Sequence, residues 1–525
     1  MGRVGIYGWG IVAPKSPNID RFAENLESTE SWLAPFNGFG PDNFLVGMPE
    51  FDFADYRQWI TGRFSSNRFR QLDERMDAST KYAIGSFVQS LQQNPGIETE
   101  LQKLGSRAHV YVGTGLGSLP THAELTLVLY KAQRTWDRFW SDPERNSALR
   151  EYLELSDEKH RARPDVPPVP ETVELHARSE AEDAWWHYWA SRSPELAKYL
   201  AEAREIEDTN VEGDVETAKL RVIREKHRLH AKLQEKWRAP DPPWTAVPAS
   251  VIWNIPNTPA CQISMMGRIT GATFAPAAAC STFGVALKLG MDAIRRGEAK
   301  AVVLGATDPP PHPLTVGAFY NARVLAADGG VSKPLTRLRG THVSGGSVIW
   351  IVGDYEYMTQ RGFRPLGMEP VAVAVTADAD HIITPSREGP TRAMRSALRT
   401  AGVRAGDIGT WDLHATATPG DFTEVETLSR VIPGSVLVTA RKGTFGHGMS
   451  AGGGWELSAQ YLGCARGRLY PTPLTQEELN REIGRLHERF VFDRARGDAN
   501  GIAGKLSMGI GGINACVISC PWGGD

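Results

Sequence analysis

Short apolar, β-branched runs alternate along the chain with stretches of helical periodicity. The expected strands are Arg3–Tyr7, Ala108–Val112, Ala301–Leu304, Val348–Val352, Val371–Val375, Val436–Thr439 and Cys516–Ile518. The helical stretches Phe283–Arg296, Thr391–Ala401 and Thr423–Val431 fall between such runs. This alternation predicts an α/β protein with buried sheets covered by helices.

The pattern is interrupted between residues 126 and 244, where the sequence turns highly charged. A proline-rich patch lies at Pro164–Pro170, and a long helical pattern runs from Asp214 to Trp237. Seven of the chain's 15 tryptophans lie in this region: Trp136, Trp140, Trp185, Trp186, Trp189, Trp237 and Trp244. We therefore predict a mainly helical insertion, whose indole rings either attach its helices to the main body or line a lid or hydrophobic tunnel.

The overall composition narrows the possible partners. The chain has 525 residues, a formal net charge of −3, and 41% hydrophobic and 23% charged residues. A general nucleic-acid-binding protein would need a basic surplus, and the longest uncharged stretch, Trp244 to Gly267, contains prolines and is a poor membrane span. The first residues contain no apolar signal-peptide core, and the five cysteines have no zinc-ligand spacing. We expect a cytoplasmic protein with reduced cysteines.

One cysteine has a neighbourhood that suits nucleophilic chemistry. Cys280 lies in Pro276-Ala-Ala-Ala-Cys-Ser-Thr-Phe-Gly284, directly before a helical pattern. Small residues permit a tight turn onto the helix, and the N–H groups and dipole at the helix N-terminus are expected to lower the thiol pKa and favour the thiolate. A cysteine among alanines is more often a small core residue, so this segment alone does not decide between the two interpretations.

Two histidine segments support the chemical interpretation. His414 lies in Trp411-Asp-Leu-His-Ala-Thr-Ala-Thr-Pro-Gly-Asp421, at a strand end, and His447 lies in Lys442-Gly-Thr-Phe-Gly-His-Gly-Met-Ser-Ala-Gly-Gly453. A lone histidine is usually structural or exposed. Two histidines in small-residue loops, together with a candidate nucleophile, indicate a catalytic site.

These segments resemble the motifs of the β-ketoacyl synthase family. The family's nucleophile lies in a pattern like T-A-C-S-S, its first histidine in H-G-T-x-T-P-x-G-D and its second in K-x-x-x-G-H-x-x-x-A-A-G. They correspond here to Cys280, His414 and His447, in the same order. Further similar segments are Ala301–Asp308, Pro313–Phe319, Asp380–Ser386 and Ser507–Asn514. The resemblance covers residues 1–125 and 245–525, which is everything except the insertion.

The resemblance implies a thiolase-like fold with two similar α/β halves, residues 1–365 and 366–525, each with a buried mixed five-stranded sheet in an αβαβα arrangement. It implies an acyltransferase that condenses an acyl thioester with malonyl-acyl-carrier protein by decarboxylation, in fatty-acid-like or polyketide biosynthesis. The substrates would be carried on phosphopantetheine, with no metal or redox cofactor. The implied partners are an acyl carrier protein and a second ketosynthase subunit, identical or related.

The resemblance also implies a role for each site residue. Cys280 would carry the acyl group, and its backbone N–H and that of Ile510 would bind the thioester oxyanion. His414 and His447 would donate to the enolate oxygen, while Lys442 organises the histidine region. The hydroxyls of Thr416 and Thr418 would contact pantetheine.

Some positions depart from the family pattern. Gly345 stands where the G-F-V-x-G-E-G-A-G segment has its acidic residue, so Lys442 is expected to lack its usual partner. Ile510 stands where a gating phenylalanine is common, and Ala415 follows His414 in place of glycine. The glycines of residues 113–117 lack the full fingerprint of a nucleotide-binding loop.

Two other functions remain open. One is a non-condensing partner subunit of the chain-length-factor type, although such subunits typically lose the nucleophile that Cys280 supplies. The other is an acyltransferase or thioesterase that uses the same cysteine. A thiolase is disfavoured because Cys516 has the pattern of a strand residue and not of a second catalytic cysteine. In each case we expect the insertion to shape access of substrate or carrier protein.

Overall fold

The computed structural model describes residues 2–40, 44–208, 215–432, 436–483, 489–497 and 501–523. The chain divides into two compact units. The first contains Met1–Pro120 and Ile252–Asp525, and the second contains Thr121–Val251. The predicted insertion, residues 126–244, lies inside the second unit.

The first unit is built on two five-stranded sheets. The first sheet has the order β1-β7-β6-β4-β5 and the second β10-β9-β11-β12-β8. Each is mixed: three strands run parallel at one end and antiparallel neighbours complete the other. The strands are β1 (Val4–Val12), β4 (Ala108–Gly113), β5 (Thr273–Phe274), β6 (Ala301–Asp308), β7 (Gly346–Asp354), β8 (Glu369–Ala377), β9 (Ile408–Asp412), β10 (Leu437–Thr439), β11 (Ile502–Gly509) and β12 (Ile513–Cys520).

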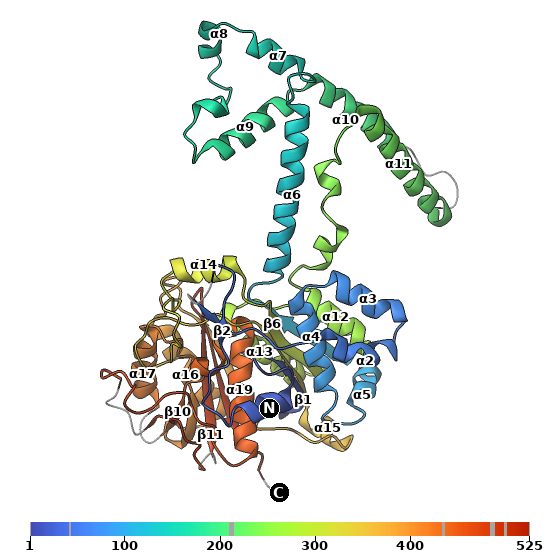
Figure 1. Ribbon diagram of the computed structural model, residues 1–525. Helices are drawn as coiled ribbons and strands as arrows, with labels where there is room; N and C mark the ends of the chain where they lie inside the picture. Colours follow the sequence, from blue (N-terminus) through green and yellow to red (C-terminus); the bar gives the residue numbers. More distant parts are fainter. Residues whose placement is uncertain are drawn as a thin grey trace. The chain divides into compact units, whose positions relative to one another are not determined.

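Two helices lie between the sheets and form the middle layer. Helix α13 (Thr282–Arg295) contacts both β6 and β8, and α19 (Met449–Ala465) contacts both β6 and β11 (Figure 1). The two helices also pack on each other. A Cβ atom on Gly454 of α19 would lie 2.5 Å from Val348 and 2.6 Å from Phe283, so only glycine permits this approach.

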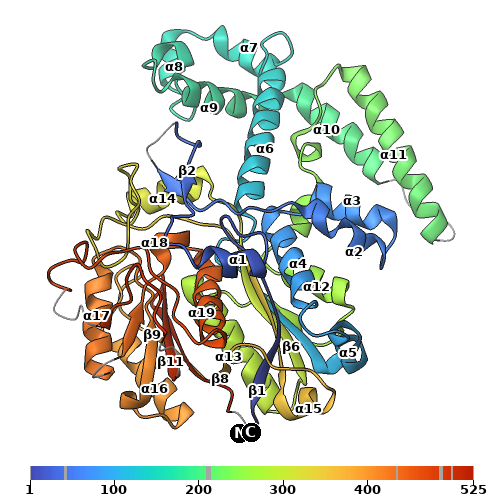
Figure 2. The same cartoon turned by 60° about the horizontal axis from the view of Figure 1, so that its bottom comes forward.

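Further helices cover the outer faces. On the first sheet lie α4 (Ala78–Ser90), α5 (Ile97–Leu104) and α12 (Thr258–Gly267), and on the second lies α16 (Glu388–Ala401), with α17 (Gly420–Val431) beside it (Figure 2). The five layers therefore alternate α, β, α, β, α, which confirms the predicted α/β arrangement. The remaining α-helices of this unit are α1 (Ile19–Asn25), α2 (Arg57–Thr61), α3 (Ser66–Arg75), α14 (Pro313–Asn321), α15 (Tyr355–Gln360) and α18 (Lys442–Phe445).

The strand predictions were correct where the sequence is continuously apolar. Strand β7, Gly-Ser-Val-Ile-Trp-Ile-Val-Gly-Asp, is buried over eight residues, as expected for a strand covered on both faces. All seven expected strands overlap observed ones, with only Arg3 and Val436 outside them. Strand β11 was not predicted, and β9 was expected only as a strand ending near His414, without bounds, because polar residues and glycines interrupt their apolar runs. Both carry parts of the candidate site.

The second unit is helical and has its own core. Trp136 and Trp140 are buried with Tyr199, and Trp185 and Trp189 with Tyr152, in clusters made only of residues of this unit. The prediction that these rings attach the insertion to the main body or line a tunnel is therefore wrong for these four, which stabilise the insertion itself. The helices are α6 (Leu119–Trp140), α7 (Ser147–Leu153), α8 (Asp157–Arg161), α9 (Arg178–Ala190), α10 (Pro194–Glu207) and α11 (Val215–Trp237).

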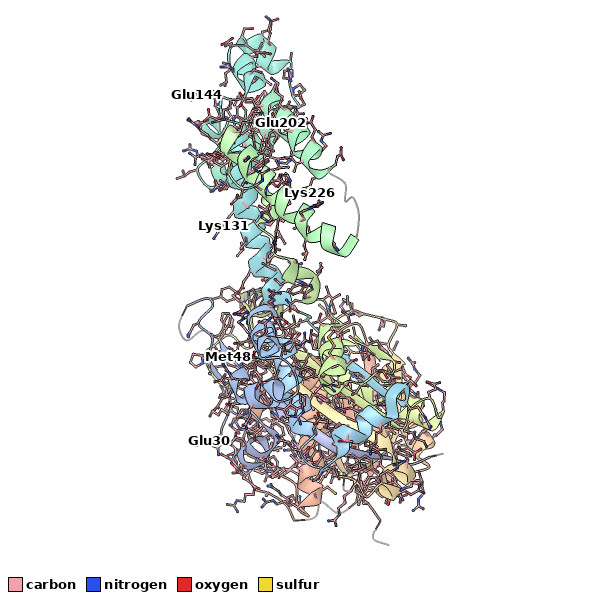
Figure 3. All side chains as sticks on the ribbon, turned by 90° about the vertical axis from the view of Figure 1, so that its right-hand side faces the viewer. Glu30, Met48, Lys131, Glu144, Glu202 and Lys226 are labelled. Carbon is pink, nitrogen blue, oxygen red and sulfur yellow. The ribbon has the colours of Figure 1, made fainter. Side chains whose placement is uncertain are left out.

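Ion pairs join α10 and α11 along their exposed faces. The carboxylate of Glu202 lies 2.7 Å from Lys236 Nζ, and that of Glu207 lies 3.0 Å from Lys226 Nζ. Figure 3 labels one member of each pair, Glu202 on α10 and Lys226 on α11. Asp214, the first residue of the predicted long helix, lies outside the described residues. None of the helices in the described part of the chain has both the length and the apolar character needed to cross a membrane.

Candidate active site

Cys280 lies on a strained turn directly before the middle-layer helix α13. The turn, η6 (Ala279–Ser281), begins with Ala279 at a φ of +48°, in the left-handed region that side chains other than glycine rarely adopt. Thr282 accepts from the N–H of Ala278 and donates to the carbonyl of Ala279, while the Ser281 hydroxyl donates to the carbonyls of Ser507 and Ile513. The hydroxyls that follow Cys280 thus hold the turn in place.

The thiol of Cys280 is buried, and this changes the expected electrostatics. Its side chain faces the backbone N–H of Ile510 and its own N–H. Burial nevertheless raises the pKa of Cys280 to about 11, against the opposing influence of the Lys442 ammonium. The prediction that the helix N-terminus lowers this pKa was therefore wrong, because loss of hydration outweighs the nearby donors.

Two carboxylates fix the loop that carries His414. Glu424, on α17, accepts from the backbone N–H groups of His414 at 2.7 Å and Ala415 at 2.8 Å. Asp421 accepts from the N–H groups of Thr416 at 2.8 Å and Ala417 at 3.1 Å. Burial raises the pKa of Glu424 to about 7 and that of Asp421 to about 6.

His447 is held by a neighbouring backbone segment. Its N–H donates to the carbonyl of His342 at 2.6 Å, and its carbonyl accepts from the N–H of Ser344 at 2.9 Å. The preceding Gly446 has a φ of +74°, and a Cβ there would lie 2.2 Å from the Ser344 hydroxyl. The chain can therefore present His447 only because glycine precedes it.

The thiol and the two imidazoles come together in space, as the sequence predicted. Each of the three side chains offers an atom, sulfur or ring nitrogen, within 4.8 Å of the other two. The rings of His414 and His447 are 5.4 Å apart, nearly perpendicular at 82°. Burial, with the nearby Lys442 ammonium, lowers the pKa of both histidines well below the usual range. Both rings are consequently neutral at pH 7.

Lys442 contacts His414, and its acidic partner is a residue that the sequence analysis did not predict. Its ammonium lies 2.5 Å from the His414 carbonyl and 3.4 Å from His414 Nδ1, and it forms an ion pair with Glu456 on α19. An ammonium only donates, so Nδ1 accepts and the ring proton of His414 is assigned to Nε2. The expectation that Lys442 lacks an acidic partner was wrong.

Gly345 has no room for the acidic side chain that the sequence reading assigned to its position. A Cβ atom there would lie 2.2 Å from the carbonyl oxygen of Pro309. Glu456 is the only charged residue of α19, whose other residues are apolar, small or uncharged. A single charge in such a helix requires a buried partner, and this was the signal available in the sequence.

A cavity of about 360 Å³ opens onto the three catalytic candidates. Its lining contains Cys280, His414, His447 and Ile510, together with Thr416 and Thr418, whose hydroxyls are 3.0 Å apart. Apolar side chains complete the wall: Ala318, Phe319, Val324, Ile382 and Ile383. Lys442 does not line this cavity, and the lining residue that its ammonium contacts is His414.

The glycine-rich residues 113–117 wrap around a carboxylate. Asp308, at the end of β6, accepts from the N–H groups of Gly115 at 2.9 Å and Leu116 at 2.8 Å and from the Thr114 hydroxyl at 3.0 Å. It also accepts from the N–H of Ser450, at the start of α19. The donors that a nucleotide loop would offer to phosphate are thus occupied, which supports rejecting that interpretation.

The same three side chains also form a candidate metal group. Sulfur and imidazole are ligands that Zn²⁺ accepts. The Lys442 ammonium beside them acts electrostatically on all three groups and opposes a divalent cation. The geometry suits a nucleophile with two neutral hydrogen-bonding rings better than it suits a metal.

Comparison with known proteins gives a consistent result. The family model "Beta-ketoacyl synthase, N-terminal domain" matches residues 226–350, and "Beta-ketoacyl synthase, C-terminal domain" matches residues 369–474. Nodulation protein E of Rhizobium meliloti is 31% identical over 223 residues, covering 42% of this chain and 55% of that protein. The chloroplastic 3-oxoacyl-[acyl-carrier-protein] synthase I of Hordeum vulgare is 27% identical over 286 residues, covering 52% and 61%. The matches thus span somewhat more than half the length of these relatives.

Solved structures agree on the fold. A β-ketoacyl synthase from Burkholderia phymatum superposes with a TM-score of 0.67 at 18% identity, covering 99% of this chain and 100% of that one. The ishigamide ketosynthase/chain length factor gives a TM-score of 0.66 at 17% identity, with 99% and 100% coverage. These matches confirm the predicted thiolase-like fold. With a family model matching part of each half, residues 226–350 and 369–474, and Cys280, His414 and His447 gathered at one cavity, the chain belongs to the β-ketoacyl synthase family.

Proposed function

We propose that the protein is a β-ketoacyl-acyl-carrier-protein synthase that performs a decarboxylative Claisen condensation in fatty-acid-like or polyketide biosynthesis. One observation carries the proposal: a buried thiol with two backbone N–H groups meets two neutral imidazoles in a single cavity. Relatives among the 3-oxoacyl-[acyl-carrier-protein] synthases support it.

In the first half-reaction, Cys280 takes the acyl group. Its sulfur attacks the acyl thioester carbonyl, the bond to the pantetheine sulfur breaks, and the released thiolate takes up a proton. The oxyanion that forms on the carbonyl lies near the N–H groups of Cys280 and Ile510, which supply preorganised donors. Because burial holds the thiol pKa at about 11, the thiol stays protonated until the substrate binds, and its proton passes to the departing pantetheine sulfur.

In the second half-reaction, the malonyl thioester loses its carboxylate. The bond between the α-carbon and the carboxylate breaks, CO2 leaves, and the electron pair moves onto the thioester oxygen as an enolate. Nε2–H of His414 and a ring N–H of His447 donate to that oxygen, so they bind charge that appears only as CO2 leaves. The enolate carbon then attacks the acyl group on Cys280, and the cysteine thiolate departs.

The cavity favours substrates delivered on a pantetheine arm. Its apolar wall suits an uncharged chain, and the hydroxyls of Thr416 and Thr418 offer polar contacts in its lining. The partner is then an acyl carrier protein, and a similar ketosynthase has been solved in complex with its carrier protein. A homodimer or a heterodimer with a related subunit completes the proposal, in line with the ketosynthase/chain length factor neighbour.

The test is incubation with acyl- and malonyl-carrier proteins, followed by intact-mass detection of acylated Cys280 and measurement of CO2 release. The proposal predicts an acyl-enzyme, CO2 and a β-ketoacyl product. An acyl-enzyme without CO2 would instead support the acyltransferase alternative. If neither acyl-enzyme nor CO2 formed with this protein alone, but both formed once a related subunit was added, the result would support a non-condensing partner subunit.

A further inference from the structure

A second lysine is buried behind the histidines, on a strand that joins the oxyanion loop. Lys505 lies on β11, five residues before Ile510, and its side chain is only 1% exposed. It is the only charged residue of that strand. A buried ammonium is unfavourable unless it is paired, so its contacts indicate its role.

The Lys505 ammonium connects two acidic residues from different elements. Its Nζ lies 2.7 Å from Oε2 of Glu456 on α19 and 3.7 Å from Oδ1 of Asp412 on β9. It also donates to the carbonyls of Leu506 at 2.6 Å and Leu413 at 3.4 Å. Leu413 directly precedes His414, so Lys505 contacts the backbone that presents this histidine.

Glu456 is therefore held from both sides. One of its oxygens pairs with Lys442 and the other with Lys505, and all three side chains are at most 2% exposed. Lys442 in turn places its ammonium on His414 Nδ1 and the His414 carbonyl. A chain of contacts thus runs from Lys505 through Glu456 and Lys442 to His414.

Both acids that Lys505 contacts also have another partner. Asp412 already has a cation, since Arg441 Nε lies 3.2 Å from its Oδ2, and it accepts from the Thr439 hydroxyl at 2.6 Å. Glu456 already has Lys442. Lys505 is thus a third cation beside two acids that each have a partner, and the buried Glu424 also acts on its charge. Its contacts join Glu456 to the backbone directly before His414, which points to a role in positioning.

We propose that Lys505 is a positioning residue for the histidine pair: by binding Glu456 opposite Lys442, it fixes the Lys442 ammonium against His414. The inference rests on the proposed condensation and deepens it. Lys505 does not line the cavity, so it touches no substrate. Its charge acts on both histidines, whose ring N–H groups are needed for the enolate and not for the transfer of the acyl group to Cys280, so its effect falls on decarboxylation and not on acylation.

The test is a double-mutant cycle with the two half-reactions measured separately on the full-length protein. Lys505→Met removes the charge and keeps the linear shape. Residues that orient an active group from behind typically contribute about 10- to 100-fold, and we expect a loss of this size in CO2 release from malonyl-carrier protein. The rate of Cys280 acylation and the KM for malonyl-carrier protein should stay unchanged. In a Glu456→Gln background, Lys505→Met should cause no further loss, because the contact that transmits its effect is already broken.

Two further variants keep the result interpretable. Lys300→Met removes a lysine that directly precedes β6, at the opposite end of that strand from Asp308, and that pairs with Asp354. This variant should leave both half-reactions unchanged. Lys505→Gln retains a hydrogen-bond donor for the Leu506 carbonyl. It is used in place of Lys505→Met if urea unfolding shows that Lys505→Met is not cooperatively folded. Wild-type CO2 release by the folded Lys505 variant, or the same fold-loss in both Glu456 backgrounds, would overturn this inference alone. Absence of CO2 release from the unsubstituted enzyme would overturn the proposed function as well.

Discussion

Glu456→Gln removes the single charge that joins Lys442 to Lys505. The carboxylate is fully buried, and one oxygen lies 2.7 Å from Lys505 Nζ. At an effective dielectric of about 20, that contact alone corresponds to about 6 kcal/mol of Coulomb attraction. The hydration that the carboxylate loses offsets much of this, and breaking a buried pair from one side typically costs about 3–5 kcal/mol. We expect a loss of that size in the free energy of unfolding.

Urea unfolding followed by circular dichroism measures this loss. The matched control is Glu24→Gln. Glu24 forms an ion pair with Arg21 at a similar distance, 2.8 Å, but both of these side chains are more than half exposed. An exposed pair contributes at most about 1 kcal/mol. If Glu456→Gln were no more destabilising than Glu24→Gln, the buried pairing of Lys442 and Lys505 with Glu456 would be refuted.

Three further outcomes follow from particular contacts. Burial raises the pKa of Glu424 from 4.5 to about 7, so the contribution of Glu424 to the free energy of unfolding falls by about 1.4 kcal/mol per pH unit as pH rises through that window. Urea unfolding of the wild type and of Glu424→Gln should show this slope in the difference between them. A stability gain of the wild type relative to the variant with rising pH would contradict it. Trp140→Ala creates a cavity at a fully buried position in the insertion's own core. It should lower the free energy of unfolding of that unit by about 3–5 kcal/mol, measured by thermal unfolding, while Cys280 is still acylated. Loss of acylation would contradict the conclusion that the insertion and the catalytic unit have separate cores. Replacing residues 126–243 with a Gly/Ser linker should change carrier-protein KM or acyl preference but not acylation itself, and unchanged KM and preference would show that the insertion does not shape access.

The grouping of the three catalytic candidates could be predicted because their motifs are local. Cys280, His414 and His447 each lie in a short segment whose small residues and order are visible in the sequence, and the fold brings these segments to one cavity. The hydroxyls that follow Cys280 and the acids that follow His414 then proved to be the groups that shape each turn.

The buried charged residues that support Lys442 and His414 could not be predicted from the sequence in the same way. Glu456 pairs with Lys442, and Lys505 reaches Glu456 only because α19 and β11 pack side by side; no local pattern encodes that second contact. Gly345 was taken for the acidic position because sequence alignment alone does not show that Pro309 fills the space above it. The direction of the Cys280 pKa was mispredicted for the same reason, since burial is a property of the packed core.

The most direct test of the proposed function is the separation of the two half-reactions in site variants. Cys280→Ala, His414→Ala and His447→Ala would each be incubated with acyl- and malonyl-carrier proteins, with acylation followed by intact mass and decarboxylation by CO2 release. We predict that Cys280→Ala forms no acyl-enzyme, whereas both histidine variants still acylate Cys280 in part but release almost no CO2 and form no β-ketoacyl product. Normal condensation by either histidine variant would contradict the account.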